Sequence, residues 1–387
     1  MSGFLSARLG RVHDVLARHV SAGAAPGAVG LLARGGAEQV FAVGDVGRDT
    51  IFRISSMTKP VTAVAAMICV EECLLRLDDP VDDTLPELAG RRVLVRADGP
   101  LASTVTAVRS ITVRDLLTFT FGLGLVFEPS PVASALEELA QGMPRPALPP
   151  GPDEWMRRIG ALPLMYQPGE RWLYNTGSDV LGVLVARASG VSFETFLAER
   201  IFAPLGMTDT GFSVPAASLG RLPAQLVTDF STGETVVFDS PSGQWSAPPA
   251  FPSGAGGLVS TVDDYAAFAG MLRGGGVFGG SRILSRSSVS LMTADQLLPQ
   301  VKAVSGLLPG QFDDTGWGFG VSVVTRRTGV AKSVGSYGWD GGLGTSWFND
   351  PASDLTAILM TQRAWTSSSP GPMFRDFWTT AAAAVSD

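Results

Sequence analysis

Histidine is almost absent from this sequence. Of 387 residues only two are histidine, and both, His13 and His19, lie near the start in a stretch with helical spacing. A Ser-His-Asp hydrolase needs an imidazole beside its nucleophile, and the sequence also lacks the Gly-x-Ser-x-Gly motif of the α/β-hydrolases. Both classes are therefore excluded. Because no cluster of histidine and carboxylate side chains is visible, we expect neither a metal site nor a cofactor.

Lysine is nearly as rare. Lys59, Lys302 and Lys332 are the only three among 29 basic residues, so arginine serves wherever a simple positive charge suffices. A buried amine, unlike a guanidinium, can lose its proton, and a lysine kept in such a chain suggests a task that needs this property. Lys59, at the start of an apolar helix, is the candidate for such a lysine.

Excess basic charge, cysteine and long apolar runs are also scarce. The net charge of −7 offers no surface for a phosphate backbone, so no nucleic-acid partner is expected. The longest apolar stretch, from Pro60 to Val70, is about half of the roughly 20 residues that a membrane-spanning helix needs, and no membrane span is expected. The start of the chain lacks the pattern of a signal peptide. Cys69 and Cys73 are interpreted as small core residues in a reducing compartment, which predicts a cytoplasmic location.

Strand patterns are concentrated at the two ends of the chain. Residues 28–33 and 40–43 read as a hairpin after a first helix, and alternating segments return as FGVSVVT, TSWFND and LTAILMT before a last helix. The middle consists of helical segments broken by loops rich in proline and glycine. We therefore predict an α+β fold, an α/β sandwich in which helices flank an antiparallel sheet built from both termini, with a large helical lobe inserted.

The lobes follow from the same pattern. Residues 1–79 plus 285–387 are expected to form the sheet lobe, and residues 80–284 the inserted, mainly helical lobe. A cleft between two lobes is the usual place for a small-molecule site, so the active site is expected at their interface. The sequence does not indicate the oligomeric state.

The motif Ser56-Met57-Thr58-Lys59 carries the chemistry. It opens an apolar helix that Asp78-Asp79-Pro80 is expected to end, and residues three apart on a helix lie on one face. Burial lowers the pKa of a lysine and makes a neutral amine available as a base. The helix start also offers the Ser56 N–H to a developing oxyanion. Ser56 is the candidate nucleophile, and Lys59 part of its activating base.

These residues and much of the chain resemble the serine β-lactamase and penicillin-binding superfamily, especially class C β-lactamases and their relatives the family VIII carboxylesterases. The segments that carry the resemblance keep their order along the chain: IFRISSMTKPVTAVAAM, ITVRDLLTFTFGLG, PGERWLYNTGSDVLGVLVARASG, PSGAGGLVSTVDDYAAFAGML, GWGFGVSV and YGWDGGLGTSWFNDP. The resemblance implies that Tyr174 is the phenol of a Tyr-x-Asn element. Its implied role, shared with Lys59, is general base in acylation and proton donor to the leaving group.

Two departures from the lactamase pattern bear on the substrate. Thr176 stands where β-lactamases keep an asparagine, and Trp339-Asp340-Gly341 replaces their Lys-Thr-Gly strand, as a comparable Trp-x-Gly does in family VIII esterases. By register, Gly342 supplies the second oxyanion N–H. Two polar handles for an anionic β-lactam are thus missing, so an uncharged, apolar ester is favoured. No role is assigned to Asp340. The expected substrate-binding residues are Phe119, Phe121, Trp172, Thr176, Trp317, Tyr337, Trp339 and Gly341.

Three hypotheses remain open at this point. The first is a carboxylesterase that cleaves short-acyl or apolar esters through a Ser56 acyl-enzyme, with acyl transfer to an alcohol or amine as a close variant. The second is a β-lactamase, D-amino-acid amidase or peptidase on the same scaffold. The third is a binding protein that has kept only the fold, which the joint presence of Ser56, Lys59 and Tyr174 disfavours. The expected partner is a small-molecule ester.

Overall fold

A seven-stranded antiparallel sheet forms the centre of the computed structural model, which describes residues 3–125, 127 and 129–385. Its strand order is β11-β12-β13-β14-β15-β1-β2. In chain order the strands are β1 (Gly27–Arg34), β2 (Ala37–Gly44), β11 (Thr315–Trp317), β12 (Ser322–Val324), β13 (Tyr337–Gly341), β14 (Thr345–Asp350) and β15 (Leu355–Thr361). The β1–β15 pairing, with Leu31 opposite Ile358, joins the two ends of the chain, which confirms the predicted fold class.

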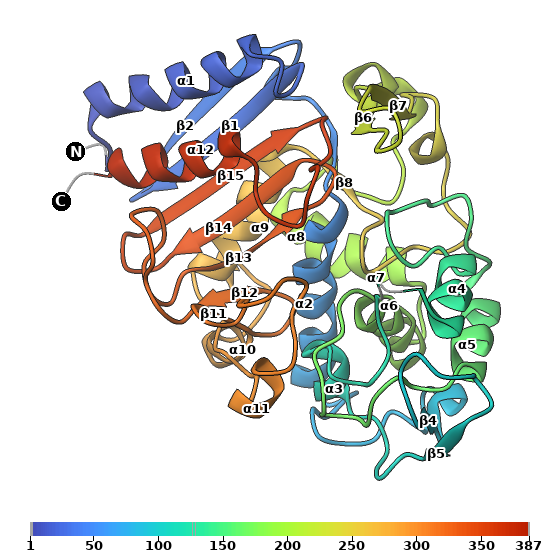
Figure 1. Cartoon of the computed structure of the whole chain (residues 1–387). Coiled ribbons are helices and arrows are strands. Elements are labelled where there is room, and N and C mark those ends of the chain that lie inside the picture. The colour runs from blue at the N-terminus through green and yellow to red at the C-terminus, as the bar shows by residue number, and fades with distance from the viewer. Residues whose placement is uncertain (1–2, 126, 128, 386–387) are drawn as a thin grey trace.

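Alternate residues of the central strands feed two separate cores, as the two-residue period of a strand requires. Leu32 of β1 packs in the core beneath α1 (Ser6–Ser21) and α12 (Pro372–Ala383). Leu31 points to the opposite face, which α9 (Val262–Arg273) covers. Figure 1 shows α1 and α12 side by side on the first face, close to both termini. Burial on both faces explains why β1 reads as an unbroken apolar run.

Helix α2 (Thr58–Glu71) lies between this sheet and the rest of the molecule (Figure 1). Its residues from Thr58 to Cys69 are all buried, so the helix is apolar all round rather than amphipathic. The helix ends at Glu71, well before the Asp78-Asp79-Pro80 sequence that was expected to end it. Cys73 then adopts φ 60° in the turn that follows. The chain leaves the helix at that turn, and the prediction from proline and aspartate alone was wrong.

The middle of the chain forms short helices and small hairpins. They are α3 (Val113–Leu117), α4 (Pro131–Glu138), α5 (Pro152–Ala161), α6 (Thr176–Ser189), α7 (Phe193–Leu197), α8 (Ala203–Leu205), β4 (Arg92–Leu94) with β5 (Thr104–Thr106), and β6 (Gln225–Thr228) with β7 (Thr235–Asp239). Of these, α6 and α7 pack against α2. Smaller elements are β3 (Phe52–Arg53) with β8 (Val259–Ser260), β9 (Val277–Phe278) with β10 (Ser281–Arg282), α10 (Arg286–Met292) and α11 (Pro299–Lys302). Although α9 falls within residues 80–284, it packs against β15 and β1 of the sheet. The proposed lobe boundaries stay a prediction.

The two cysteines differ in burial. Cys69 is buried and Cys73 is exposed, so only the first is a core residue as expected; neither forms a disulfide. Within the described residues no single helix is long and apolar enough to cross a membrane, and one bent pair, Thr176–Ser189 with Phe193–Leu205, meets the length and composition.

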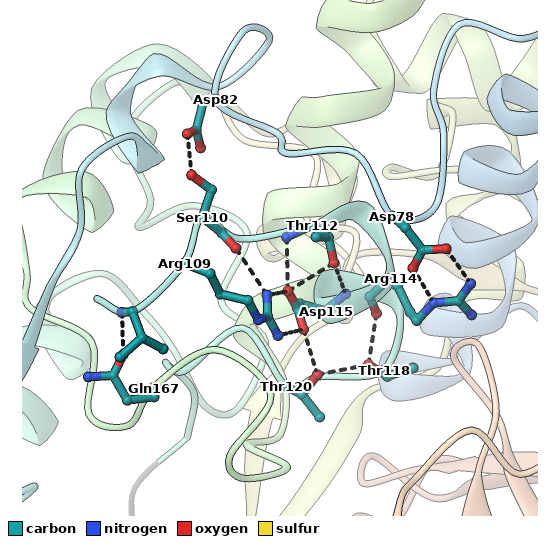
Figure 2. A network of polar contacts seen from close by, with 11 residues as sticks. Asp78, Asp82, Arg109, Ser110, Thr112, Arg114, Asp115, Thr118, Thr120 and Gln167 are labelled. Carbon is teal, nitrogen blue, oxygen red and sulfur yellow. Dashed lines mark hydrogen bonds and ion pairs between the residues drawn. The ribbon is translucent and has the colours of Figure 1, made fainter. Parts of the chain in front are cut away.

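A polar network centred on Asp115 fixes the turn that follows α3 (Figure 2). The carboxylate accepts hydrogen bonds from the Arg109 guanidinium, from the backbone N–H and hydroxyl of Thr112, and from the Thr120 hydroxyl. Phe119, directly before Thr120, has φ 60°. Its carbonyl accepts a hydrogen bond from the Leu173 N–H at 2.8 Å. The network therefore holds the segment that precedes Tyr174.

Replacing Asp115 with asparagine is expected to lower the free energy of unfolding by about 1–3 kcal/mol, because an amide NH₂ would face groups that are themselves donors. Chemical denaturation monitored by circular dichroism checks this. Asp98→Asn is the matched control, since its ion pair with Arg96 is exposed at the surface and its loss should change stability by less than about 0.5 kcal/mol. Equal effects of the two substitutions would contradict the structural role of Asp115.

Candidate active site

Ser56 lies in a single 3₁₀ turn, Ser55–Met57, directly before α2. Ser55 adopts φ 40°, an uncommon conformation for a residue with a side chain. The Tyr265 hydroxyl donates to the Met57 carbonyl at 2.9 Å and holds the turn from below. Among the described residues no acceptor takes the Ser56 N–H, so this donor is free for a ligand.

Lys59 is fully buried in the first turn of α2 and has three acceptors. Its Nζ lies 3.0 Å from Ser56 Oγ, 2.8 Å from Asn175 Oδ1 and 2.6 Å from the Ala255 carbonyl oxygen. Burial lowers its pKa to about 7, and the negative charge of Asp179 opposes part of that fall. The geometry thus pairs a hydroxyl with an amine that can be neutral at ordinary pH.

Tyr174 lies at the other side of Ser56, just before α6. Its hydroxyl accepts a hydrogen bond from the Trp339 indole N–H at 2.7 Å, and the Lys59 amine lies 4.4 Å from the centre of its ring. Burial raises the pKa of Tyr174, while hydrogen bonding to Ser56 and Trp339 opposes the rise. The phenol is therefore protonated at neutral pH and suited to donate a proton.

Asn175 reaches Lys59 through a strained turn. Its backbone has φ 85° and ψ −70°, and the Thr176 N–H donates to the Tyr174 carbonyl at 3.3 Å. These values describe a rare γ-turn with positive φ, a conformation that costs free energy and is often found at functional sites. The amide of the middle residue thus contacts the Lys59 amine, whereas the hydroxyl of Thr176, at the third position of the element, donates to Gln141.

Gln141 and Asp179 complete the surroundings of Lys59. The Gln141 amide accepts from Thr176 Oγ1 at 2.8 Å and from Asn175 Nδ2 at 3.3 Å, and donates to Asp179 Oδ2 at 2.8 Å. Asp179 also accepts from the Ala255 N–H at 3.0 Å. The carbonyl oxygen of Ala255 in turn accepts from Lys59. Sequence reasoning missed Gln141, Asn175 and Asp179. The one available signal was for Asp179, a lone carboxylate at the start of the apolar helical segment DVLGVLVA.

Strand β13 comes close to the nucleophile turn because it carries glycine there. A Cβ on Gly341 would lie 2.3 Å from the Ile54 carbonyl oxygen and 2.2 Å from Thr345 Oγ1, too close for any side chain. The next residue, Gly342, has its carbonyl occupied by the Trp365 N–H at 2.9 Å. No acceptor among the described residues takes the Gly342 N–H, and Gly342 and Ser56 line the same cavity.

Two cavities meet at Ser56. The larger, of about 690 Å³, has Ser56, Tyr174, Trp339 and Gly342 among its lining residues. The smaller has room for about 30 Å³ and is lined by Gln141 and Asn175 together with aromatic side chains. A site with a roomy side and a confined side can bind two groups of unequal size on either side of one reacting atom.

Three of the six aromatic residues expected to bind substrate, Phe119, Trp172 and Trp317, form a layer behind these cavities. Trp172 stacks on Tyr174 at 5.5 Å between ring centres, Phe119 lies edge-on to it at 5.9 Å, and Trp317 meets Trp339 edge-on at 4.7 Å. They support the Tyr174 and Trp339 rings from behind. Of the residues expected to bind substrate, neither cavity is lined, in the described chain, by Phe119, Phe121, Trp172, Thr176, Trp317 or Gly341.

Two further expected residues have other surroundings. Phe121 belongs to the main hydrophobic core. Tyr337 borders the larger cavity, but its hydroxyl accepts from Asn349 Nδ2 at 3.1 Å in the interior. Among the described residues no group of three or more histidine, cysteine, aspartate or glutamate side chains is placed to hold a metal ion.

A protein-family model described as Beta-lactamase matches residues 12–373. Esterase EstB of Burkholderia gladioli is 30% identical over 95% of this chain and 93% of its own length. Protein Rv1367c of Mycobacterium tuberculosis is 40% identical over 81% of this chain and 78% of its own. Among solved structures, EstCE1, described as a hydrolase with promiscuous acyltransferase activity, superposes with a TM-score of 0.79, 25% identity, and coverage of 97% of this chain and 98% of that one.

The fold and site define a protein of the serine β-lactamase and penicillin-binding superfamily. The chain belongs to the beta-lactamase family and lies near the family VIII esterases. Its relatives support a serine hydrolase or acyl-transferring enzyme. The resemblance seen in the sequence is thereby confirmed.

Proposed function

We propose that this chain is a carboxylesterase of the family VIII type that cleaves short-acyl or apolar esters through a covalent Ser56 acyl-enzyme. The observation that carries the proposal is the Ser56 hydroxyl, which is 3.0 Å from the Lys59 amine, adjoins Tyr174 and opens onto both cavities. A nucleophile beside its base, with free backbone donors at hand, is the arrangement that acyl transfer to serine needs.

Acylation begins with proton transfer from Ser56 Oγ to neutral Lys59, while the oxygen attacks the ester carbonyl carbon. The N–H groups of Ser56 and Gly342 donate to the oxyanion that forms. When the carbon–oxygen bond of the ester breaks, Tyr174 gives its proton to the leaving alcohol and recovers one from protonated Lys59. Because burial lowers the pKa of Lys59 to about 7 and raises that of Tyr174, the amine is the base and the phenol is the acid.

Deacylation repeats these steps with water as the nucleophile, and the acid product leaves. An alcohol or amine in place of water would give acyl transfer, and the description of EstCE1 as a hydrolase with acyltransferase activity makes this the second candidate. The amidase and β-lactamase alternatives have less support, because Trp339 replaces the lysine that would bind a β-lactam carboxylate.

The two cavities suggest which side of the ester lies where. Tyr174, the proposed proton donor to the leaving alcohol, lines the larger cavity and not the smaller one. The alcohol part therefore occupies the larger cavity and the acyl part the smaller. Room for about 30 Å³ beside Gln141 and Asn175 suits a short acyl chain. A cytoplasmic location is proposed as well, on the sequence grounds given above.

The test compares p-nitrophenyl acetate, butyrate and decanoate with the β-lactam nitrocefin, and measures intact mass after treatment with a fluorophosphonate probe. Hydrolysis should be fastest for the short acyl chains and slow for nitrocefin. Activity should fall in proportion to the fraction of the protein that gains one phosphonyl group. Faster hydrolysis of nitrocefin than of every ester would favour the lactamase alternative, and absence of labelling together with absence of hydrolysis would refute the enzyme assignment.

The pH dependence of kcat/KM is expected to follow Lys59. Only the neutral amine accepts the Ser56 proton, so kcat/KM for p-nitrophenyl butyrate should rise with pH through about 7 and then level off. The negative charge of Asp179 raises the pKa of Lys59, so Asp179→Asn should move the midpoint to lower pH. Asp264→Asn, which removes a buried carboxylate from α9, should leave the midpoint unchanged. A midpoint that stays or rises in Asp179→Asn would contradict the assignment of Lys59 as base.

A further inference from the structure

Lys332 is a partly buried lysine whose amine has aromatic neighbours but, among the described residues, no hydrogen-bond or ion-pair partner. Its amine lies 4.0 Å from the centre of the Trp378 ring and 4.9 Å from that of Phe348, so two aromatic faces hold the cation. Among the described residues no hydrogen bond or ion pair reaches its Nζ, whereas Lys302, the third lysine, is paired with Asp295 at 2.5 Å. In a chain that uses arginine almost everywhere else, an unpaired lysine in an aromatic recess has no evident structural task.

Asp340 lies near Lys332 and is also incompletely paired. It is the middle residue of the Trp339-Asp340-Gly341 sequence, and its side chain points to the face of β13 opposite Trp339, towards Ser346 of β14. One of its oxygens, Oδ1, is buried without a hydrogen-bond donor in the described chain. The charges of Lys332 and Asp340 attract each other, but in the described part of the chain no ion pair joins the amine to the carboxylate.

Lys332 and Asp340 both line the cavity that contains Ser56. The open edge of β13 allows residues from both faces of the sheet to line one cavity. Strand β12 pairs with β13 only at Tyr337 and Gly338, so the edge beyond them is left without a ladder partner. The cavity is lined by Trp339 from one face of the sheet and by Phe348 and Trp378 from the other, so we infer that it passes along this open edge. Asp340 precedes the oxyanion residue Gly342 by two positions, a span of roughly 7 Å along a strand. A ligand held at Ser56 can thus extend to the recess at Lys332.

We propose that Lys332, cradled by Phe348 and Trp378, is a binding subsite for an anionic group, such as a carboxylate, on the alcohol part of the substrate. The proposal rests on the proposed function, which places the alcohol part in this cavity. It replaces the uncharged ester expected from the sequence with a short-acyl ester of a hydroxy acid, whose charge binds at Lys332 and not at Trp339. The aromatic walls suit the carbon chain between the ester and the charge. The unpaired amine donates to the carboxylate, and Asp340 opposes a second negative charge.

The experiment uses ω-acetoxy carboxylates of about four to eight carbons, whose extended lengths bracket the roughly 7 Å between Asp340 and Gly342. The methyl ester of each acid is its neutral counterpart. Acetate release gives kcat/KM for both, and their ratio reports recognition of the charge. The wild type should favour the anion at one or more chain lengths. Lys332→Met keeps the unbranched stem but removes the charge, and should lower the ratio at least about tenfold.

Matched variants separate this role from a structural one. Lys332→Arg should keep most of the preference, Lys302→Met should leave it unchanged, and Asp340→Asn should raise it because an opposing carboxylate is lost. Rates on the neutral esters should stay within about twofold in Lys332→Met, since charge is not what binds them. A wild type that favours no anion, or a ratio unaffected by Lys332→Met, would overturn the subsite. Failure of the wild type to hydrolyse even the neutral acetates would instead refute the esterase function.

Discussion

A chain with Ser56 replaced by alanine is expected to hydrolyse p-nitrophenyl butyrate at least about 10⁴-fold more slowly than the wild type. The acyl-enzyme needs an oxygen at this position, and among the described residues no other hydroxyl contacts the Lys59 amine to replace it. The oxyanion donors remain in this variant, since both are backbone N–H groups, so a small residual rate is expected. Initial rates over a wide enzyme concentration range measure the loss.

The neighbouring serine provides a matched control. Ser55→Ala removes a hydroxyl one residue away, whose oxygen accepts from the Leu343 N–H at 3.4 Å and not from the reacting groups. This variant should still gain one phosphonyl group with a fluorophosphonate, whereas Ser56→Ala should gain none. Labelling of Ser56→Ala at the wild-type rate would show that the nucleophile is a different residue.

The contact between Ser56 and Lys59 was predictable from the sequence, because the scarcity of histidine and lysine pointed to it. With two histidines on α1, far from any catalytic motif, the amine of Lys59 was the remaining base, and its burial follows from the apolar residues around it in the sequence. The same holds for the sheet, since strands β1, β14 and β15 are continuous or alternating apolar segments whose period is local. Local patterns determine local structure, and these elements needed nothing else.

The surroundings of Lys59 were not predictable, because they depend on contacts between distant segments. Gln141 comes from a loop rich in proline and glycine, and its amide is oriented by contacts with Asn175, Thr176 and Asp179, which lie far from it in the sequence. The γ-turn at Asn175 gives no sequence signal beyond the residue itself. The family pattern directed attention to the third position, Thr176, although the middle residue supplies the oxygen for Lys59.

The arrangement of the expected aromatic residues also depends on contacts between distant segments. Proximity in sequence to a motif predicts proximity to the site, but not which side of a ring faces the substrate. Phe119, Trp172 and Trp317 lie near Tyr174, yet they form the layer that supports it. Their contribution is to hold the phenol and the Trp339 indole in place, an arrangement that rigid aromatic contacts provide at low entropic cost.

Replacing Tyr174 with phenylalanine is expected to lower kcat/KM for hexyl butyrate by about 10²–10⁴-fold, the usual contribution of a positioned acid. The loss should be at least about tenfold smaller for p-nitrophenyl butyrate, because p-nitrophenolate leaves without needing a proton whereas a hexyl alkoxide does not. Tyr166→Phe, which removes a hydroxyl from a tyrosine packed under Arg171 and away from Ser56, should change neither rate. Equal losses on the two esters would mean that Tyr174 acts before the carbon–oxygen bond breaks, as a base, and would reverse its assignment with Lys59. Rates on both esters near those of the wild type would remove Tyr174 from the mechanism.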